Sequence, residues 1–175
     1  RKIEYKKNSI IKSDGIHSIE MNHEGRSQQS IEEFEIIKKI IDQSIGCEFT
    51  DFDNSKRKIN VNDILIVSPY NVQVNFLKER LIKGIRCGTI DKFQGMEAPI
   101  VIISMTSSSV EDLPRNKKFF FNRNRLNVAI SRAQCSSILL INPKLLESPP
   151  IDYEEFRLIN NFQKLMKFKI KNVKR

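Results

Sequence analysis

Two spacings of apolar residues alternate along this chain. Short continuous apolar runs at 64–67, 99–106 and 136–141 have the pattern of strands that are buried on both faces. Residues 31–45 repeat apolar side chains at helical spacing, as a helix that packs on a sheet does. This alternation predicts an α/β fold with a mainly parallel sheet and helices on both faces.

Helix signals follow the run at 64–67 directly. Ser68 stands at the expected N-cap, Pro69 at the first helical position and Gly84 just past the expected end. Residues 48–63 are polar and show no period, so a loop is expected there. Further strands are expected at 17–23 and 85–90, further helices at 122–134 and 152–168, and a short helix is expected to start at Pro143.

Composition limits the class of protein. The chain has 175 residues, 39% of them hydrophobic, which is enough for one domain with a core. Its net charge of +9 is compatible with binding to nucleic acid, and equally with a solvated basic surface.

Three cysteines, Cys47, Cys87 and Cys135, lie far apart, which favours reduced thiols in a cytoplasmic protein. The sequence contains no apolar run of about 20 residues that would span a membrane. It begins without a methionine or a signal peptide, so we expect a piece of a longer protein. Metal-ligand spacings, nucleophile elbows and the phosphate-binding P-loop pattern are missing, so the chain is not a self-sufficient ATPase of the P-loop type.

A short polar turn separates two apolar segments in GTIDKFQGMEAPIVIISMT. Gly95 allows a sharp bend or a close approach of a ligand, and Thr89 and Lys92 suit hydrogen bonds to phosphate. Glu97 directly precedes a buried strand, so its carboxylate needs a partner, either a guanidinium or a sugar hydroxyl. The plainer alternative is a structural turn in which Asp91 caps a helical turn.

The helix expected at 122–134 aligns two arginines with its apolar stripe. Arg125 and Arg132 are seven residues apart and fall along one edge of that stripe. One interpretation is ordinary packing of the aliphatic stems with the charged heads in water. The other is a guanidinium pair presented to an anion across a domain boundary. The stripe consists of Leu126, Ala129, Ile130 and Ala133.

Ligands of parallel α/β sheets bind at the carboxyl ends of the strands. We therefore expect functional residues just after Val67, after 85–87 and after Thr106, and we expect Arg132 to face the same edge. His23 alone is a weak signal, typical of a structural histidine.

Taken together, residues 68–74, 88–105 and 124–134 resemble, in this order, motifs IV, V and VI of the superfamily 1 helicases. The resemblance is to the branch that includes the nonsense-mediated-decay RNA helicase and the nuclease-associated DNA helicases. Residues 23–37 resemble the family's segment ahead of motif IV. The likeness covers about 17–146.

The resemblance implies the second RecA-like domain, with a three-layer α/β/α fold, of a two-domain motor. ATP with Mg²⁺ would lie between this domain and the first RecA-like domain of the same polypeptide, which supplies the P-loop and the magnesium-binding carboxylates. Without that domain the chain is expected to be inactive. Residues 1–16 would be a lead-in, 17–146 the helicase domain, and 147–175 a C-terminal helix with a basic tail.

The resemblance also assigns roles at the nucleotide. Arg132 matches the catalytic arginine finger, and Glu97 matches the motif V glutamate that meets the ribose or the γ-phosphate side of ATP. Gln94 and Gly95 would shape that turn. Arg125 would be a second cation, either on phosphate or holding Glu97.

A single strand of nucleic acid, DNA rather than RNA, is the expected partner. Two alternatives stay open: a non-catalytic nucleic-acid-binding module with the same fold, and a nucleotide-binding α/β domain of unrelated role. Met96 and Gln134 depart from the family pattern, whereas Glu97 and Arg132 are intact and favour the motor. The expected nucleic-acid contacts are Ser68, Pro69, Tyr70, Thr89, Asp91 and Lys92.

Overall fold

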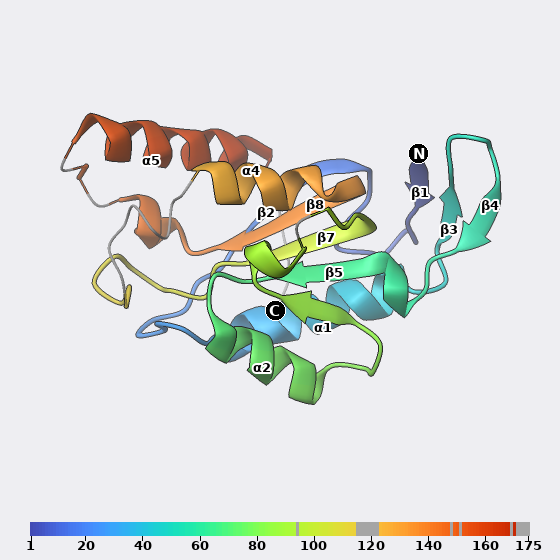
Figure 1. Ribbon diagram of the computed structural model, residues 1–175, viewed down its shortest axis with the longest axis horizontal. Helices are drawn as coiled ribbons and strands as arrows, with labels where there is room; N and C mark the ends of the chain where they lie inside the picture. Colours follow the sequence, from blue (N-terminus) through green and yellow to red (C-terminus); the bar gives the residue numbers. More distant parts are fainter. Residues whose placement is uncertain (94, 115–122, 148, 151, 169, 171–175) are drawn as a thin grey trace.

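The computed structural model describes every residue except 94, 115–122, 148, 151, 169 and 171–175, and of 123–125 it describes the backbone only. Its main sheet has five strands, all parallel, in the order β2-β8-β7-β5-β6 (Figure 1). The predicted parallel sheet is thus confirmed. The strands are β2 (Gly15–Glu20), β5 (Ile64–Val67), β6 (Arg86–Gly88), β7 (Ala98–Ser104) and β8 (Ala133–Ile141).

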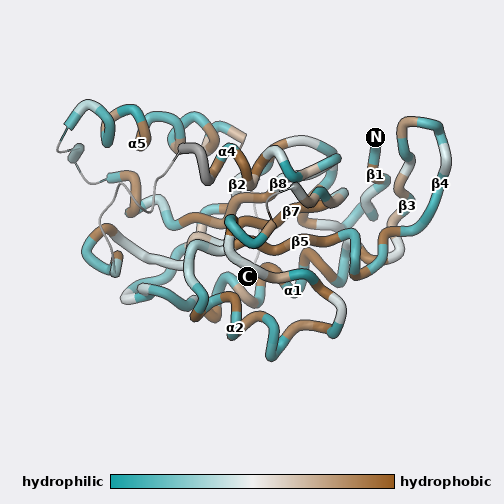
Figure 2. The backbone as a smooth tube through the Cα atoms, in the orientation of Figure 1, coloured by the Kyte–Doolittle hydropathy of each residue, from teal (hydrophilic) through white to brown (hydrophobic). Residues whose placement is uncertain are grey.

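Helices cover both faces of this sheet, as the pattern predicted. On one face lie α1 (Ile31–Ser44) and α2 (Asn71–Arg80); on the other lie α4 (Arg123–Ser131) and α5 (Tyr153–Leu165) (Figure 1). Successive strand residues divide between the two hydrophobic layers, because side chains alternate between the faces of a strand. In β5, Ile64 and Ile66 pack toward α1 and α2, and Leu65 and Val67 toward α4 and α5. The hydropathy colouring shows the resulting apolar centre (Figure 2).

Because all five strands run the same way, the sheet has an amino edge, where its strands begin, and a carboxyl edge, where they end. Because the strands are parallel, each helix that connects two of them must carry the chain back from the carboxyl edge to the amino edge.

The helix predicted at 31–45 is observed within one residue. Ser30 is its N-cap, and the hydroxyl of Ser30 accepts a hydrogen bond from the backbone N–H of Glu33 (3.2 Å). Of the apolar residues that repeat at helical spacing, Ile31 is 50% exposed, whereas Glu33 is fully buried. The buried face of α1 therefore includes a carboxyl group.

The predicted start of α2 is wrong by two residues. The backbone N–H of Ser68 donates to the carbonyl of Gly88 (3.1 Å), which extends the pairing of β5 with β6 past Val67. Pro69 follows in this non-helical stretch, and Tyr70 is the N-cap, with extended backbone and no capping side chain. The helix ends at Arg80, so the turn containing Gly84 lies beyond it.

The loop predicted at 48–63 is also wrong. It contains β3 (Glu48–Thr50), β4 (Lys56–Lys58) and a 3₁₀ turn, η1 (Val61–Asp63). With β1 (Lys2–Glu4) these strands form a small antiparallel sheet beside the amino edge (Figure 1). Three-residue strands are too short to show a period.

The other elements match the predicted types, with one correction: α4 ends at Ser131, and Ala133, expected on that helix, is the first residue of β8, which was expected only from 136. β6 is followed by the 3₁₀ turn η2 (Ile90–Phe93), and the helix after Pro143 is the 3₁₀ turn η3 (Pro143–Leu146). The end of α5 continues into η4 (Met166–Phe168). None of the helices in the described part of the chain is long and apolar enough to cross a membrane.

Candidate functional site

Glu97 and Arg132 lie together at the amino edge. Ala98 and Ala133, which follow them, are paired residues of the neighbouring strands β7 and β8. The backbone N–H of Ala98 donates to the carbonyl of Arg132 (3.0 Å). The expectation that Arg132 faces the carboxyl edge is therefore wrong. The reason is topological: Arg132 follows the end of a crossover helix, α4, and such a helix ends at the amino edge.

The guanidinium of Arg132 is anchored to the helix that precedes it. Its Nε donates to the carbonyl of Val128 (3.2 Å), one of the last carbonyls of α4, and the side chain is half-buried. This contact satisfies a helix-end carbonyl with a cation, as the helix dipole favours. The rest of the planar fork has further N–H groups with which to bind an anion.

Glu97 is exposed, although its position before a buried strand suggested otherwise. Its side chain is 52% accessible, because β7 becomes buried only from Ala98 onward. The carboxylate accepts a hydrogen bond from Gln134 Nε2 (3.3 Å) and lies 4.0 Å from Arg1 Nη1. The predicted need for a partner is thus met by an amide and a more distant guanidinium. Gln134, which departs from the family pattern, contacts a residue of the predicted site.

Of the other residues predicted to contact the nucleotide, the structure describes only Gly95 in full. Gly95 has φ of 82°, in the left-handed region that favours glycine, and open space surrounds its missing Cβ. Gln94 lies outside the described residues, and so does the side chain of Arg125. Their assigned roles stay predictions.

The residues predicted to touch nucleic acid lie at the opposite, carboxyl edge. Ser68, Pro69 and Tyr70 follow β5; Thr89, Asp91 and Lys92 follow β6. Ser68 and Tyr70 are buried, whereas Asp91 and Lys92 are exposed and Thr89 is half-buried. A cavity of about 500 Å³ opens among them. Four of the six line it: Pro69, Tyr70, Thr89 and Asp91.

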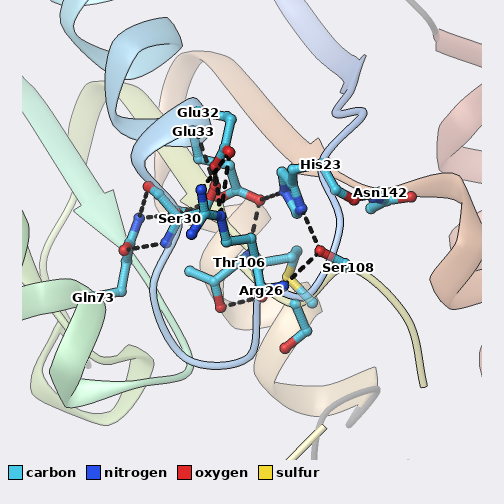
Figure 3. Close-up of polar contacts among 12 residues, drawn as sticks. His23, Arg26, Ser30, Glu32, Glu33, Gln73, Thr106, Ser108 and Asn142 are labelled. Carbon is cyan, nitrogen blue, oxygen red and sulfur yellow. Dashed lines mark hydrogen bonds and ion pairs between the residues drawn. The ribbon is translucent and has the colours of Figure 1, made fainter. Parts of the chain in front are cut away.

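A buried carboxylate that the sequence analysis missed organises this edge (Figure 3). Glu33 Oε2 accepts a hydrogen bond from the hydroxyl of Ser104 (2.5 Å), and Oε1 accepts from the backbone N–H of Thr106 (2.9 Å). His23 Nε2 lies 3.4 Å from Oε1. Thr106 has φ of 66°, a strained value for a β-branched residue, so the Glu33 bond holds an unfavourable backbone.

His23 and Gln73 extend the cluster to further loops. The ring Nδ1 of His23 contacts the hydroxyl of Ser108 (2.7 Å), which also accepts from the backbone N–H of Arg26 (2.9 Å). Gln73 on α2 donates through Nε2 to Ser104 Oγ (3.1 Å), and its Oε1 accepts from the N–H of Ser30 (3.1 Å). We call this group the carboxyl-edge network: His23, Ser30, Glu33, Gln73, Ser104, Thr106 and Ser108.

The network joins loops that follow β2 and β7 to the first turns of α1 and α2. Asn142, just after β8, adds a bond from its Nδ2 to the carbonyl of His23 (2.7 Å). His23 is therefore structural, as its weak signal suggested. One signal was available for Glu33: it lies three, four and seven residues before Ile36, Ile37 and Ile40, on the buried stripe of α1.

An ion pair borders this network on the solvent side. Arg26 Nη2 lies 2.7 Å from Glu32 Oε1. Partial burial acts to raise the pKa of Glu32, but hydrogen bonds, first that from Arg26 and then those from its own backbone and Ser30, outweigh it and lower the pKa to about 2. Glu32 is thus held ionised.

The thiols take no part in this chemistry. Burial raises the pKa of Cys87 to about 12 and that of Cys135 to about 11, so both are protonated thiols rather than nucleophilic thiolates at neutral pH. The cysteines that the structure describes are free. Among the described residues no group of His, Cys, Asp and Glu side chains is arranged to hold a metal ion.

Comparison with known proteins places this architecture. A family model described as an AAA domain matches residues 2–144, most of the chain. The chain is 33% identical over 117 residues to an uncharacterised ATP-dependent helicase of Caenorhabditis elegans. It is 34% identical over 99 residues to the probable RNA helicase armi of Drosophila melanogaster, and 32% identical over 100 residues to the regulator of nonsense transcripts 1 homolog of Arabidopsis thaliana.

These matches cover 66%, 52% and 51% of the chain, respectively. They cover only 7%, 8% and 8% of the three relatives, so the chain spans less than a tenth of each. The family match, the helicase relatives and the five-stranded parallel sheet agree with one another. The chain therefore belongs to the superfamily 1 helicases, in the branch of the nonsense-mediated-decay helicase, as a C-terminal helicase domain.

Proposed function

We propose that this domain completes an ATP site from its amino edge and carries part of a single-stranded nucleic-acid track on its carboxyl edge. In this proposal Arg132 is the arginine finger, and Glu97 contacts the nucleotide beside it. The single observation that carries the proposal is the position of these two side chains, next to each other at the starts of neighbouring strands.

The amino edge is a suitable surface for this role. A P-loop domain binds phosphates at the carboxyl edge of its own sheet, where helix N-termini point at the anion. A second domain that stacks on it in the same orientation presents its amino edge to that nucleotide. Arg132 would then reach the γ-phosphate, and the first RecA-like domain would hold Mg²⁺ and most of the ATP.

The residues present suit a triphosphate only in part. Arg132 offers a charged planar fork, which binds phosphate oxygens in pairs, and Glu97 offers an acceptor for a ribose hydroxyl. Phosphate-cradling glycine loops are absent from the sequence, so ATP hydrolysis requires the domain that supplies the P-loop. ATP bound by that domain with Mg²⁺ would supply the reactive phosphorus. This chain would supply positive charge that stabilises the transferring γ-phosphate.

The test is Arg132→Ala in the complete polypeptide that contains this chain. We expect nucleic-acid binding to persist and ATP turnover to fall by about 10³-fold or more, the usual contribution of such a finger. Arg157→Ala is a matched control, because Arg157 is an exposed arginine of α5 that stacks on Tyr153. Turnover of the Arg132 variant within twofold of the control would overturn the assignment.

For the track, we propose that Lys92 and Thr89 contact the phosphate backbone. Lys92 is exposed beside the cavity and Thr89 lines it. The motifs alone favoured DNA, but a relative named as an RNA helicase supports testing RNA first. Binding by exposed cations weakens as salt rises, because bound phosphates release counterions.

Lys92→Ala is therefore expected to reduce the slope of log affinity against log salt by about one. Lys39→Ala, on the exposed face of α1, is the control and should leave the slope unchanged. Equal slopes for both variants would remove Lys92 from the track. Nucleic-acid binding without any ATP turnover by the unmodified polypeptide would favour the non-catalytic module instead.

A further inference from the structure

We propose that the carboxyl-edge cavity receives one unstacked base of the bound single strand. This inference rests on the proposed nucleic-acid function and adds a subsite to it. The nucleotide candidates Glu97 and Arg132 lie at the other edge of the sheet, so the cavity is separate from the proposed ATP contacts.

The cavity lies at the point where the connections of the sheet diverge. In the sheet, β5 and β7 are neighbours. From β5 the chain passes through α2 to β6, on the far side of β5, and from β7 it passes through α4 to β8, on the far side of β7. A crevice opens between the carboxyl ends of two strands whose connections diverge in this way, and it is where open α/β sheets bind ligands. Val67, at the end of β5, and Ile103 and Met105, at the end of β7, line the cavity.

Its walls suit a base better than a phosphate. The inner wall is apolar and partly aromatic, with Val67, Tyr70 and Phe162, and all three are buried side chains. A phosphate placed there would lose its hydration without a cation in return. A base has apolar faces and a polar rim, and bases bind single-strand proteins by packing such faces against apolar and aromatic side chains.

The mouth of the cavity offers the polar groups that a base rim needs. Asn71 and Asp91 line it and are exposed; one supplies an amide, the other a carboxylate, which accepts hydrogen bonds from amino groups. Its volume, about 500 Å³, lies within the range of sites that bury small molecules. That is room for a base with its sugar.

The position of the cavity beside the proposed phosphate contacts also favours a base as its occupant. Lys92 directly follows Asp91, and Thr89 itself lines the cavity. A strand whose phosphates contact these side chains would have its bases within reach of the opening. The alternative occupant, an apolar side chain of another protein, has no such continuity with a neighbouring site.

A scan with abasic nucleotides tests this subsite on the complete polypeptide. Single-stranded oligonucleotides, RNA and DNA, each carry one abasic residue at successive positions, and their affinities are compared with the intact strand. We expect one position at which losing the base weakens binding by about fivefold to a hundredfold, the range for a packed base. A 2-aminopurine at that position should change its fluorescence on binding.

A variant that fills the opening of the cavity tests whether the base found by the abasic scan binds there. Val72 lines the cavity from the first turn of α2 and is 45% exposed, so Val72→Phe can be accommodated without disturbing the core. It should weaken the intact strand and reduce the abasic penalty to within twofold. Ile82→Phe changes an aliphatic residue that is 57% exposed and does not line the cavity, and it should preserve the penalty.

The outcomes separate this inference from the function on which it rests. If intact strands bind with the Lys92-dependent salt slope but every abasic position behaves alike, the base subsite is wrong and the track stands. A penalty that survives Val72→Phe at full size also overturns it. If intact strands do not bind at all, both fail.

Discussion

The two edges of the sheet are built differently. At the amino edge, Glu97 is exposed and Arg132 half-buried, and their described contacts are to an amide, a guanidinium and a helix carbonyl. At the carboxyl edge, Glu33 is fully buried, and two donors are hydrogen-bonded to its carboxylate. The carboxylate of Glu97 faces solvent, whereas that of Glu33 is enclosed.

This difference indicates which edge has its geometry fixed within this domain. A buried network fixes loops within a single domain, because unsatisfied polar groups in the interior are costly. The carboxyl edge therefore carries its own preformed surface. At the amino edge Glu97 is exposed, and Arg132 is held by one described side-chain hydrogen bond, so we expect their working geometry to depend on an opposing domain.

The largest expected effect is on stability and comes from Glu33. Glu33→Ala leaves the Thr106 N–H and the Ser104 hydroxyl buried without their acceptor, and should lower the free energy of unfolding by about 3 kcal/mol or more. Urea-induced unfolding measures it. Glu35→Ala, on the exposed face of the same helix, should stay within about 0.5 kcal/mol of the unmodified protein.

Equal losses for the two glutamates would mean that the carboxyl edge is no more preorganised than the surface. Glu33→Gln sharpens the result, because an amide keeps the shape and one acceptor oxygen. Its cost should fall between those of the two alanine variants.

An intermediate effect is expected from pH. The folded pKa of Glu32, about 2, lies below its ordinary value of 4.5. Its stabilising contribution is therefore complete above pH 4.5 and is lost as the pH falls from 4.5 toward 2. Solvent screens this half-exposed pair, so the contribution should be about 1 kcal/mol or less.

Unfolding free energies measured between pH 2 and 6 check this expectation. Glu32→Gln should show a shallower fall in stability across that window than the unmodified protein. If both curves are parallel there, the Arg26–Glu32 pair contributes nothing to the rigidity of this edge.

The smallest expected effect is at the amino edge. Glu97→Ala and Arg132→Ala should each change the free energy of unfolding by less than about 0.5 kcal/mol, the usual range for surface positions. Thermal or urea unfolding measures both. A loss above 1.5 kcal/mol for Arg132→Ala would identify the residue as a packing arginine, the plainer interpretation of its place beside the apolar stripe.

Local signals predicted α1, β5 and β7 well. Ser30 at the N-cap and a long apolar period define the helix, and uninterrupted apolar runs define buried strands. The small sheet of β1, β3 and β4 was missed because its three-residue strands carry no period. The wrong edge predicted for Arg132 has another cause. The two ends of a crossover helix lie at opposite edges of the sheet, and Arg132 follows the end of α4 that lies at the amino edge.

The sequence singled out Glu97 and Arg132, first by their places beside a buried strand and an apolar stripe and then by the family resemblance. It did not give their arrangement at the amino edge. The carboxyl-edge network escaped because its members are dispersed along the chain and meet only after the sheet forms. Glu33 alone had a local signal, a charge on a buried stripe.

The helix α4 has a consequence of its own, since it connects the two edges of the sheet. Leu126 near its start lines the cavity, and Arg132 just beyond its end is tied to the carbonyl of Val128. Six residues of α-helix measure about 9 Å and resist compression along their axis. A shift of Leu126 along the helix axis would be carried toward Arg132, so we expect occupancy of the cavity and the position of the guanidinium to be linked.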